Sequence, residues 1–419
     1  MSIEGSSHWE RWLSMAVVIV YGLLAVGFSF GPIFEGPDEI EHYRYVRTLV
    51  ETHSLPDPAG QVRGEYHQAP LYYLLLAPVA ALIDDDDFTA IDGRLNPYYG
   101  ARIHLVGNDN KNLYLHSRTE AFPYDQSATA ASVHLLRLIS VLLGVGTLLV
   151  SMAIFRLLWP DHAPLRVATL ALVAFWPQFL YLSSVINNDT LLIFLATATL
   201  YWLLVLLRDG PARRTSVLLG VTLGALLLTK VSAVFVAIPV GVVLLLDRRA
   251  WRSVPLIALI VVGVAGWWYA RNTILYGDPA NTGAVLDTWE AEVIDPGGLA
   301  FDIALDRVPF AYETLWARFG QGAVPVVPGI YRVFDLLLVA AGTGLLWRLW
   351  RQARALQIGI GARYALVLVV FVLTWIGVLF YWAATAWSGN QGRYLLPGIA
   401  AMSATVSYTH LTLPTNREV

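Results

Sequence analysis

The 419-residue sequence lacks cysteine and carries little charge. Without cysteine, the chain cannot form a disulfide framework, a thiol nucleophile or a thiolate metal site. Charged residues make up 14% of the chain, whereas about 25% is usual for a soluble domain. Lysine is almost missing, since only Lys111 and Lys230 occur among 28 basic residues. A net charge of −3 also argues against a nucleic-acid partner.

Apolar residues dominate instead, at 56% of the chain. They fall in long blocks, and one soluble core could not hide so much apolar surface. This composition excludes a soluble globular enzyme and a disordered chain. We predict an all-α, polytopic integral membrane protein.

Blocks of helical length predict nine membrane spans and a partial tenth. They lie near 13–30, 135–155, 167–186, 190–207, 216–229, 231–246, 254–270, 333–347, 364–384 and, as the partial span, 395–405. The apolar block 216–246 would be about 46 Å long as one helix, too long for a bilayer core of about 30 Å. We therefore predict two short helices there, with a turn near Thr229–Ser232.

Arginine-rich short loops predict the orientation. With the split at Lys230, the loops 156–166, 208–215, 247–252 and 348–363 all fall on the side of the N-terminus, and the positive-inside rule makes that side cytoplasmic. Two long loops, 31–134 and 271–332, are then extracytoplasmic.

Two short apolar segments need a separate interpretation. The segment 69–83 is too short for a span and contains two prolines, which favours an interfacial or re-entrant helix. The first apolar block, 13–30, has no clear cleavage site. We expect an uncleaved anchor there rather than a signal peptide.

The last residues differ from the rest of the chain. The apolar helix that begins at 395 stops near 405, and residues 406–419 (VSYTHLTLPTNREV) are polar. This stretch resembles the translation of a transposon-end sequencing adapter, so we leave it out of the fold prediction. A genuine polar tail is the alternative. The expectation is that the natural protein is longer and that this chain is its N-terminal, C-terminally truncated part.

An acidic segment follows the first span. Pro37 suits the first turn of a helix, so we predict a short juxtamembrane helix over 38–50 within GPIFEGPDEIEHYRYV. Asp38 and His42 then share one face. Two adjacent carboxylates, Asp38 and Glu39, beside apolar surface suit a general base and a ligand-orienting group. A solvated acidic helix start, favoured by the helix dipole, is the alternative.

Further polar residues lie on the same predicted side. Asn188 and Asp189 stand between the third and fourth spans, where the alternative is a polar turn with an N-cap. His67 opens the interfacial segment, where the alternative is a surface histidine. Arg271 follows the seventh span and Arg393 precedes the tenth, where the alternative for each is an anchor at the membrane interface.

Lys230 is the most unusual single residue. A lysine near the bilayer centre costs about 2.5–3.5 kcal/mol, so an anionic group should compensate it, and a lipid phosphate would serve. A lysine that extends to the interface is the alternative. Together these carboxylates, histidines and cations suggest an anionic, lipid-borne substrate with a base nearby.

Several segments of the chain resemble the GT-C superfamily of membrane glycosyltransferases. That superfamily includes the protein O-mannosyltransferases (family 39) and the lipid A aminoarabinose transferases, besides a less characterised bacterial subgroup. The matching segments are PDEIEHYRYV (37–46), YHQAPLYYLLLAP (66–78), LLRLISVLLG (135–144), NNDTLL (187–192), LLTKVSA (227–233), WWYARNTILYGDP (267–279) and GRYLLPGIA (392–400). They extend over nearly the whole chain before the tail.

The resemblance implies a GT-C-like helical bundle in the bacterial cytoplasmic (inner) membrane. It implies transfer of a sugar from a polyprenyl-phosphate donor, such as an undecaprenyl-phosphate sugar, to an acceptor hydroxyl on the extracytoplasmic face, with inversion at C1. The acceptor would be a glycan, a lipid or a protein, and the partners would be membrane lipids rather than nucleic acid. Activity of the truncated chain is left open.

The resemblance also implies roles for individual residues. Asp38 would be the general base, and Glu39 would orient the acceptor or hold a cation. Further candidates for binding the donor phosphate and lining the pocket are Lys230, Arg271, Arg393, Tyr394, His42, His67, Asn188 and Asp189. No organic cofactor is expected. A divalent metal is left open, with Asp38 and Glu39 as its ligands if one binds.

Two other classes of function remain as alternatives. A transporter or flippase of lipid-linked saccharides should place polar residues along a midplane pathway, often with inverted repeats, and no repeat is visible here. A non-catalytic membrane protein of envelope assembly would not need Asp38, Lys230 and Arg393 to face one cavity.

Overall fold

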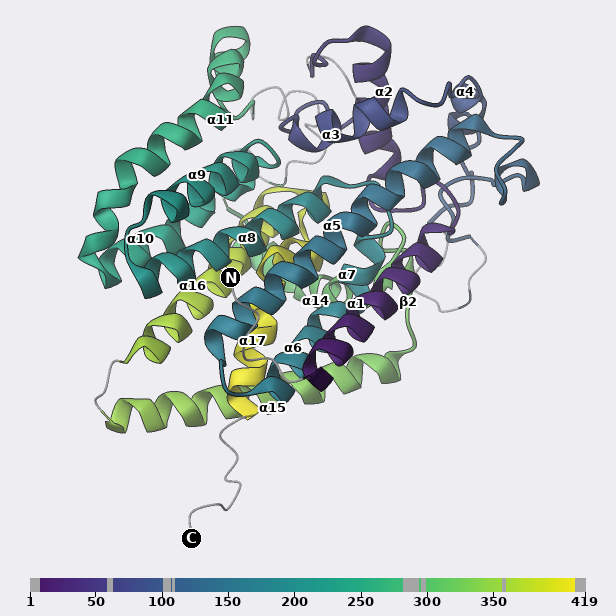
Figure 1. Cartoon of the computed structure of the whole chain (residues 1–419). Helices are drawn as coiled ribbons and strands as arrows, with labels where there is room; N and C mark the ends of the chain where they lie inside the picture. Colours follow the sequence, from purple (N-terminus) through teal and green to yellow (C-terminus); the bar gives the residue numbers. More distant parts are fainter. Residues whose placement is uncertain are drawn as a thin grey trace.

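A computed structural model describes residues 8–58, 63–100, 107, 110–281, 294, 299–355 and 359–410, with the backbone alone at 341, 345–355 and 408–410. The described structure is mostly helical (Figure 1). Its α-helices are α1 (His8–Ser29), α2 (Glu39–Thr52), α3 (Leu71–Ala80), α4 (Phe88–Asp92), α5 (Ala128–Leu158), α6 (Ala163–Ala174), α7 (Pro177–Leu182), α8 (Asn188–Asp209), α9 (Arg213–Leu227), α10 (Ala237–Leu246), α11 (Val254–Tyr276), α13 (Phe301–Asp306), α14 (Val308–Trp316), α15 (Pro328–Ala355), α16 (Ile360–Thr385) and α17 (Ile399–His410).

Short 3-10 helices and one hairpin complete the described structure. The 3-10 helices are η1 (Arg118–Glu120), η2 (Val231–Val236), η3 (Arg248–Ser253), η5 (Trp387–Gly389) and η6 (Gly392–Gly398). Strands β1 (Arg318–Phe319) and β2 (Val324–Pro325) pair antiparallel.

Five described helical segments are long and apolar enough to cross a membrane. They are α1, α5, α8, α16 and the continuous η3–α11 segment. Helix α8 is the most enclosed of them, and α5 and α9 pack along it. The chain is therefore a polytopic helical membrane protein, as the composition predicted.

The predicted span 167–186 is not one helix. Helix α6 ends at Ala174 and α7 begins at Pro177. Trp176, the residue before the proline, is extended with φ −69° and ψ 113°. Proline disfavours helical geometry in the preceding residue and lacks the N–H that a continuous helix needs, so the apolar run breaks into two short pieces.

The long apolar block 216–246 also breaks, at the place where a break was expected. Helix α9 ends at Leu227, Lys230 is extended with φ −157° and ψ 134°, and η2 follows directly before α10. Lys230 therefore lies in a turn between two helices and not on the side of one continuous helix.

Other boundaries differ from the predicted ones by a turn or more. Helix α11 continues to Tyr276, and α15 is 28 residues long where 333–347 was expected. Helix α17 continues to His410, past the expected end near 405. Residues 411–419 of the proposed foreign tail lie outside the described residues.

Helix α1 is fixed at both ends by buried ion pairs. Near its start, Arg166 donates to both carboxylate oxygens of Glu10, at 2.8 and 2.7 Å. Beyond the turn that follows α1, Arg137 of α5 does the same to Glu39, the first residue of α2. Each pair is closed to solvent. One holds the start of α1 in place, and the other holds the turn that follows α1.

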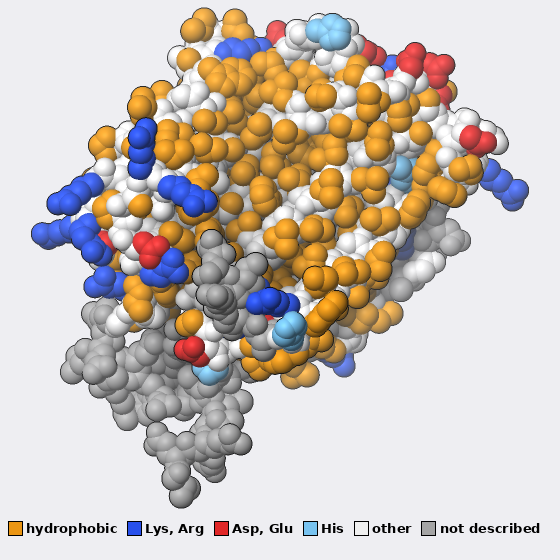
Figure 2. All heavy atoms as spheres, in the orientation of Figure 1, with side chains coloured by type: hydrophobic (Ala, Val, Ile, Leu, Met, Phe, Trp, Pro, Cys, Tyr) orange, Lys and Arg blue, Asp and Glu red, His pale blue; other side chains and the backbone are white. Residues whose placement is uncertain are grey.

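Charge is distributed unevenly over the surface. Figure 2 shows a broad hydrophobic face, with most of the basic side chains at the left and most of the acidic side chains at the upper right. Helices α2, α3 and α4 group at one end of the bundle in Figure 1, and Asp38, the N-cap residue of α2, belongs to this end.

Candidate active site

The chain turns sharply between α1 and α2, and Asp38 lies at the end of this turn. Phe34 and Asp38 both have positive φ, 63° and 56°. Asp38 occupies the N-cap position of α2, but its side chain makes no capping hydrogen bond. A non-glycine residue in this conformation costs free energy and persists where the surroundings enforce it, often at functional sites.

The Asp38 carboxylate forms an ion pair with Arg393 in η6. Arg393 in turn lies beside Asp189, with 3.6 Å between Nε and Oδ2. Asp189 accepts a 2.7 Å hydrogen bond from Nζ of Lys230. We call these four residues the charged cluster. It joins the α1–α2 turn, η6, the start of α8 and the α9–η2 turn, which are far apart in the sequence.

The four members of the charged cluster differ in exposure. Arg393 and Asp189 are buried, with side chains 5% and 4% exposed, whereas the Asp38 side chain is 34% exposed. Nε and Nη1 of Arg393 have no hydrogen-bond partner among the described residues. A buried guanidinium with two unbonded nitrogens is suited to bind an additional anion.

The environment lowers the pKa of Asp38. Partial burial acts to raise it, but the attraction of Arg393, aided by His42 and Lys230, outweighs that effect. Asp38 is therefore held as a carboxylate while it is paired with Arg393.

Tyr394 packs against both cations. Its ring centroid is 5.3 Å from Nζ of Lys230 and 5.6 Å from the Arg393 guanidinium carbon. These distances suit cation–π contacts. The Lys230–Asp189 pair also means that the anionic partner we expected for Lys230 comes at least partly from the protein.

The two candidate histidines lie beside the charged cluster. His42, one turn after Asp38 on α2, is buried, and its Nδ1 is 2.8 Å from the Tyr73 hydroxyl. Burial lowers the pKa of His42, although Glu65 and Asp38 oppose this effect. An imidazole with a lowered pKa favours the neutral form.

His67 and Asn188 meet through Gln68. The Gln68 amide nitrogen is 3.1 Å from Nε2 of His67, and its oxygen accepts a 3.3 Å hydrogen bond from Asn188. Asn187, the residue before, caps α8 by accepting from Thr190 N. The N-cap alternative thus describes Asn187, while Asp189 belongs to the charged cluster.

Glu39 lies apart from the charged cluster. It is closed to solvent, and both of its oxygens accept 2.7 Å hydrogen bonds from Arg137. The backbone N–H of Ile186 adds a bond of 2.9 Å. Burial acts to raise the pKa of Glu39, but Arg137 outweighs it and lowers the pKa overall. Both oxygens are occupied, so Glu39 serves here as an anchor of the α1–α2 turn.

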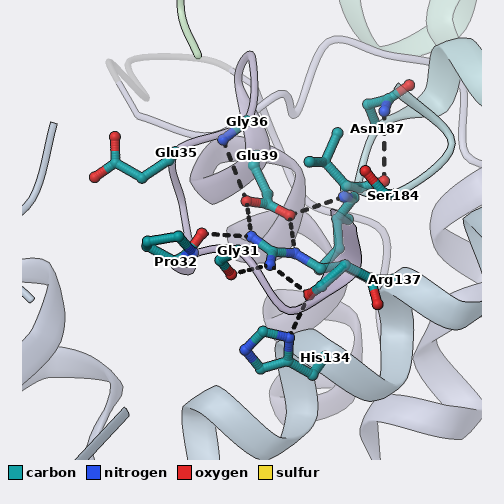
Figure 3. Close-up of polar contacts among 12 residues, drawn as sticks. Gly31, Pro32, Glu35, Gly36, Glu39, His134, Arg137, Ser184 and Asn187 are labelled. Carbon is teal, nitrogen blue, oxygen red and sulfur yellow. Dashed lines mark hydrogen bonds and ion pairs between the residues drawn. The ribbon is translucent and has the colours of Figure 1, made fainter. Parts of the chain in front are cut away.

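Arg137 also holds the turn by donating to backbone carbonyl oxygens (Figure 3). It donates to the carbonyl oxygens of Ser29 at 2.9 Å, Gly31 at 2.6 Å and Pro32 at 2.8 Å. This residue is not among the predicted site residues. The signal for it is an arginine inside the apolar segment LLRLISVLLG, because intramembrane charges are rarely without a role.

The carboxylates of Asp38 and Glu39 have different partners. Their carboxylates turn to different arginines, Arg393 and Arg137. Among the residues that the structure describes, no group of three or more potential metal ligands lies close enough together to hold an ion. A divalent metal at Asp38 and Glu39 stays an untested prediction.

Arg271 stands outside the charged cluster. Its guanidinium lies 5.4 Å from the Trp268 ring centroid and 5.8 Å from that of Tyr276, and it donates to Asn272 at 3.3 Å. No carboxylate in the described ranges lies within ion-pair distance of it. The structure thus brings together Asp38, Asp189, Lys230, Arg393 and Tyr394, with the histidines adjacent, and leaves Glu39 and Arg271 apart.

Comparison with known families agrees with the resemblance in the sequence. The model of the dolichyl-phosphate-mannose-protein mannosyltransferase family matches residues 95–281. This range contains Asp189, Lys230 and Arg271 but not Asp38 or Arg393. No curated protein sequence matches the chain.

Solved structures show the same fold. The crystal structure of ArnT from Cupriavidus metallidurans bound to undecaprenyl phosphate matches with a TM-score of 0.57 at 15% identity, over 98% of this chain and 61% of that one. Its apo structure matches with 0.58 at 14% identity, over 97% and 61%. The S. cerevisiae Pmt1-Pmt2 complex bound to the sugar donor is a weaker match, at 0.43 and 15% identity over 66% and 34%.

These findings confirm the likeness to the GT-C superfamily of glycosyltransferases and the GT-C-like helical bundle. The chain spans 61% of the length of the ArnT structures that it matches.

Proposed function

We propose that the protein transfers a sugar from a polyprenyl-phosphate donor to an acceptor hydroxyl on the extracytoplasmic face of the bacterial inner membrane. The observation that carries this proposal is the charged cluster. It combines a buried, incompletely bonded Arg393, the recessed Lys230 and the more exposed carboxylate of Asp38. Support also comes from the family match and from the ArnT fold, one of whose structures holds undecaprenyl phosphate.

Arg393 and Lys230 are the proposed phosphate ligands. They lie on either side of Asp189, and both contact the Tyr394 ring. The negative charge on the phosphate grows as the bond between C1 and the phosphate oxygen breaks. Fixed cations in a site with little water stabilise this charge more strongly than water does.

Asp38 is the proposed general base. Of the two carboxylates in the charged cluster, Asp38 is the exposed one, while Asp189 is buried against Lys230. An acceptor hydroxyl that arrives from outside the bundle therefore reaches Asp38 first. The acceptor oxygen would attack C1 on the side opposite the phosphate, with inversion, while its proton passes to Asp38.

Glu39 and Arg137 have a positioning role in this proposal. They hold the turn that forces Asp38 into its positive-φ conformation, and they do not touch the substrate. His42, His67 and Asn188 line the region next to the charged cluster, where they can contribute to binding the sugar or the acceptor.

The purified chain in lipid nanodiscs tests the proposal. A panel of polyprenyl-phosphate sugars is titrated against wild type, Asp38→Asn and Lys230→Ala, and turnover is followed with candidate acceptors. We expect saturable donor binding in wild type and in Asp38→Asn, weakened at least tenfold in Lys230→Ala, and turnover lost in Asp38→Asn. Asp92→Asn, a change of the same charge in another outer ion pair, should behave like wild type.

Two results would count against the proposal. Turnover at the wild-type rate in folded Asp38→Asn would remove Asp38 as the base. Inorganic phosphate that competes with the donor at equal concentration would point to a water-soluble phosphate ligand in place of a lipid-linked one.

A further inference from the structure

Arg393 is placed between the proposed base and the proposed phosphate site. Its Nη2 pairs with Asp38, its Nε lies 3.6 Å from Asp189, and its Nη1 has no hydrogen-bond partner in the described part of the chain. A guanidinium carries five N–H donors in a fixed plane. One such group can thus contact a carboxylate on one edge and a phosphate on another.

We infer that Arg393 exchanges partners during the reaction, holding Asp38 while the donor site is empty and the donor phosphate once it is filled. This inference rests on the proposed function. The base is thereby restrained until the donor arrives, because a carboxylate in a close ion pair with arginine accepts a proton poorly.

The charge balance of the cluster supports the exchange. Two cations, Arg393 and Lys230, face two carboxylates, Asp38 and Asp189, so the empty cluster is neutral. A donor phosphodiester adds one negative charge. Three anionic groups then compete for two cations in a largely buried site. Asp38 is the more exposed of the two carboxylates, so it is the one that gives up its arginine.

The group transfer itself conserves atoms and charge. The acceptor O–H gives its proton to an Asp38 oxygen, and the acceptor oxygen forms a bond to C1. The bond between C1 and the phosphate oxygen breaks, and its electron pair remains on the phosphate. The reaction thus moves one negative charge from Asp38 to the leaving polyprenyl phosphate, where Arg393 is already bound and stabilises it.

Asp189 is not the carboxylate that is released. It is buried, and its hydrogen bond of 2.7 Å holds Lys230. Asp38 is more exposed and sits on a turn with a positive φ of 56°. Of the two carboxylates, only Asp38 therefore has both open space beside it and a reason to change partner.

The exchange predicts that Asp38 competes with the lipid phosphate for Arg393. The test measures the dissociation constant of a polyprenyl phosphate, without sugar, for the purified chain in nanodiscs at fixed pH and ionic strength. Wild type is compared with Asp38→Asn, Asp38→Gly and the charge-matched control Asp92→Asn. Asparagine and glycine both tolerate the positive φ of this position, and a thermal melt confirms that each variant is folded.

We expect both Asp38 variants to bind polyprenyl phosphate at least about fivefold more tightly than wild type, since breaking an ion pair worth about 1 kcal/mol frees Arg393 for the ligand. Asp92→Asn should bind like wild type. Equal or weaker binding by folded Asp38→Asn and Asp38→Gly would overturn the exchange and leave the proposed function standing. No binding of polyprenyl phosphate by wild type would overturn the proposed function itself.

Discussion

Glu39 and Arg137, 98 residues apart in the sequence, form two parallel hydrogen bonds of 2.7 Å in a place closed to solvent. This pair fixes the turn between α1 and α2. Asp38 lies in that turn, directly before Glu39. A residue on α5 thereby determines where the proposed base lies.

Loss of Arg137 should destabilise the protein strongly. Arg137→Ala leaves a buried carboxylate without its counter-ion, which costs about 3–5 kcal/mol. Arg137→Lys should recover only part of this, because lysine cannot make the two parallel bonds and still reach three carbonyl oxygens. Equilibrium unfolding in mixed micelles measures both values.

The control for this prediction is Arg63→Ala. Arg63 is an exposed arginine whose ion pair with Asp92 spans 3.4 Å, and exposed pairs contribute at most about 1 kcal/mol. If Arg137→Ala were no more destabilising than Arg63→Ala, the anchoring role of the Glu39–Arg137 pair would be wrong.

The sequence allowed part of the site to be predicted. Lys230 stood out because a charge inside a long apolar block needs a partner, and Asp38 because two acids directly follow a predicted span. Asp38 and Glu39 were read as a pair because they are adjacent. Consecutive residues on a helix point in different directions. Asp38 and Glu39 therefore pair with two different arginines. The partner of Glu39 comes from another helix, and no local pattern reveals such a contact.

The fold, too, could be predicted only in part from the sequence. Apolar length correctly indicated a membrane protein, because it follows from composition alone. The break at Pro177 was missed, since the hydropathy of 167–186 is continuous and hydropathy does not register that proline ends a helix. The resemblance to GT-C enzymes supplied the arrangement of helices, which neither length nor periodicity determines.

Gly392 should be essential for the position of Arg393. A Cβ at this glycine would collide with the Ala311 carbonyl oxygen and press against Leu315, and its N–H donates to the Thr314 hydroxyl at 2.7 Å. Gly392→Ala must push η6 away from α14, at a cost of about 1–3 kcal/mol. Arg393 moves with η6, so binding of polyprenyl phosphate should weaken along with the melting temperature.

Gly377→Ala provides the matched control, because the added methyl group in α16 meets nothing within 4 Å apart from the neighbouring backbone of its own helix. Replacing a helical glycine by alanine stabilises by about 0.5–1 kcal/mol, so its melting temperature should not fall. Wild-type stability and lipid binding in Gly392→Ala would show that η6 is not held as closely as the structure indicates.

Stability should depend on pH through His116. Its Nε2 is 2.8 Å from Glu35 and its Nδ1 is 2.9 Å from Glu120, which also pairs with Arg94. Burial acts to lower the pKa of His116, but the two glutamates outweigh it and raise the pKa overall. A raised pKa in the folded state adds stability that is complete below the unfolded value of about 6.5 and disappears as pH rises through the folded value.

His116→Gln isolates this contribution. We expect it to lower stability by about 1.5–3 kcal/mol at pH 5.5, the size of hydrogen bonds to charged groups, and by less as the pH approaches 9. Melting temperatures of wild type and His116→Gln across this range give the difference. In a Glu35→Gln background the pH-dependent part should shrink. A difference that grew with pH would have the wrong sign for a protonated His116.

The Lys230–Asp189 pair should show strong energetic coupling. Lys230→Met leaves Asp189 with only the longer contact to Arg393, and Asp189→Asn leaves Lys230 without its 2.7 Å partner. Each single change to a buried pair should cost about 3–5 kcal/mol, whereas removing both charges together costs much less. The double variant should therefore be more stable than the sum of the single effects predicts, with a coupling energy of at least about 1 kcal/mol.

Equilibrium unfolding of the four proteins in the absence of lipid phosphate measures this coupling. Additive effects would mean that Lys230 relies on a lipid phosphate rather than on Asp189 for its counter-charge, and the protein without lipid would then carry an unpaired cation at this turn.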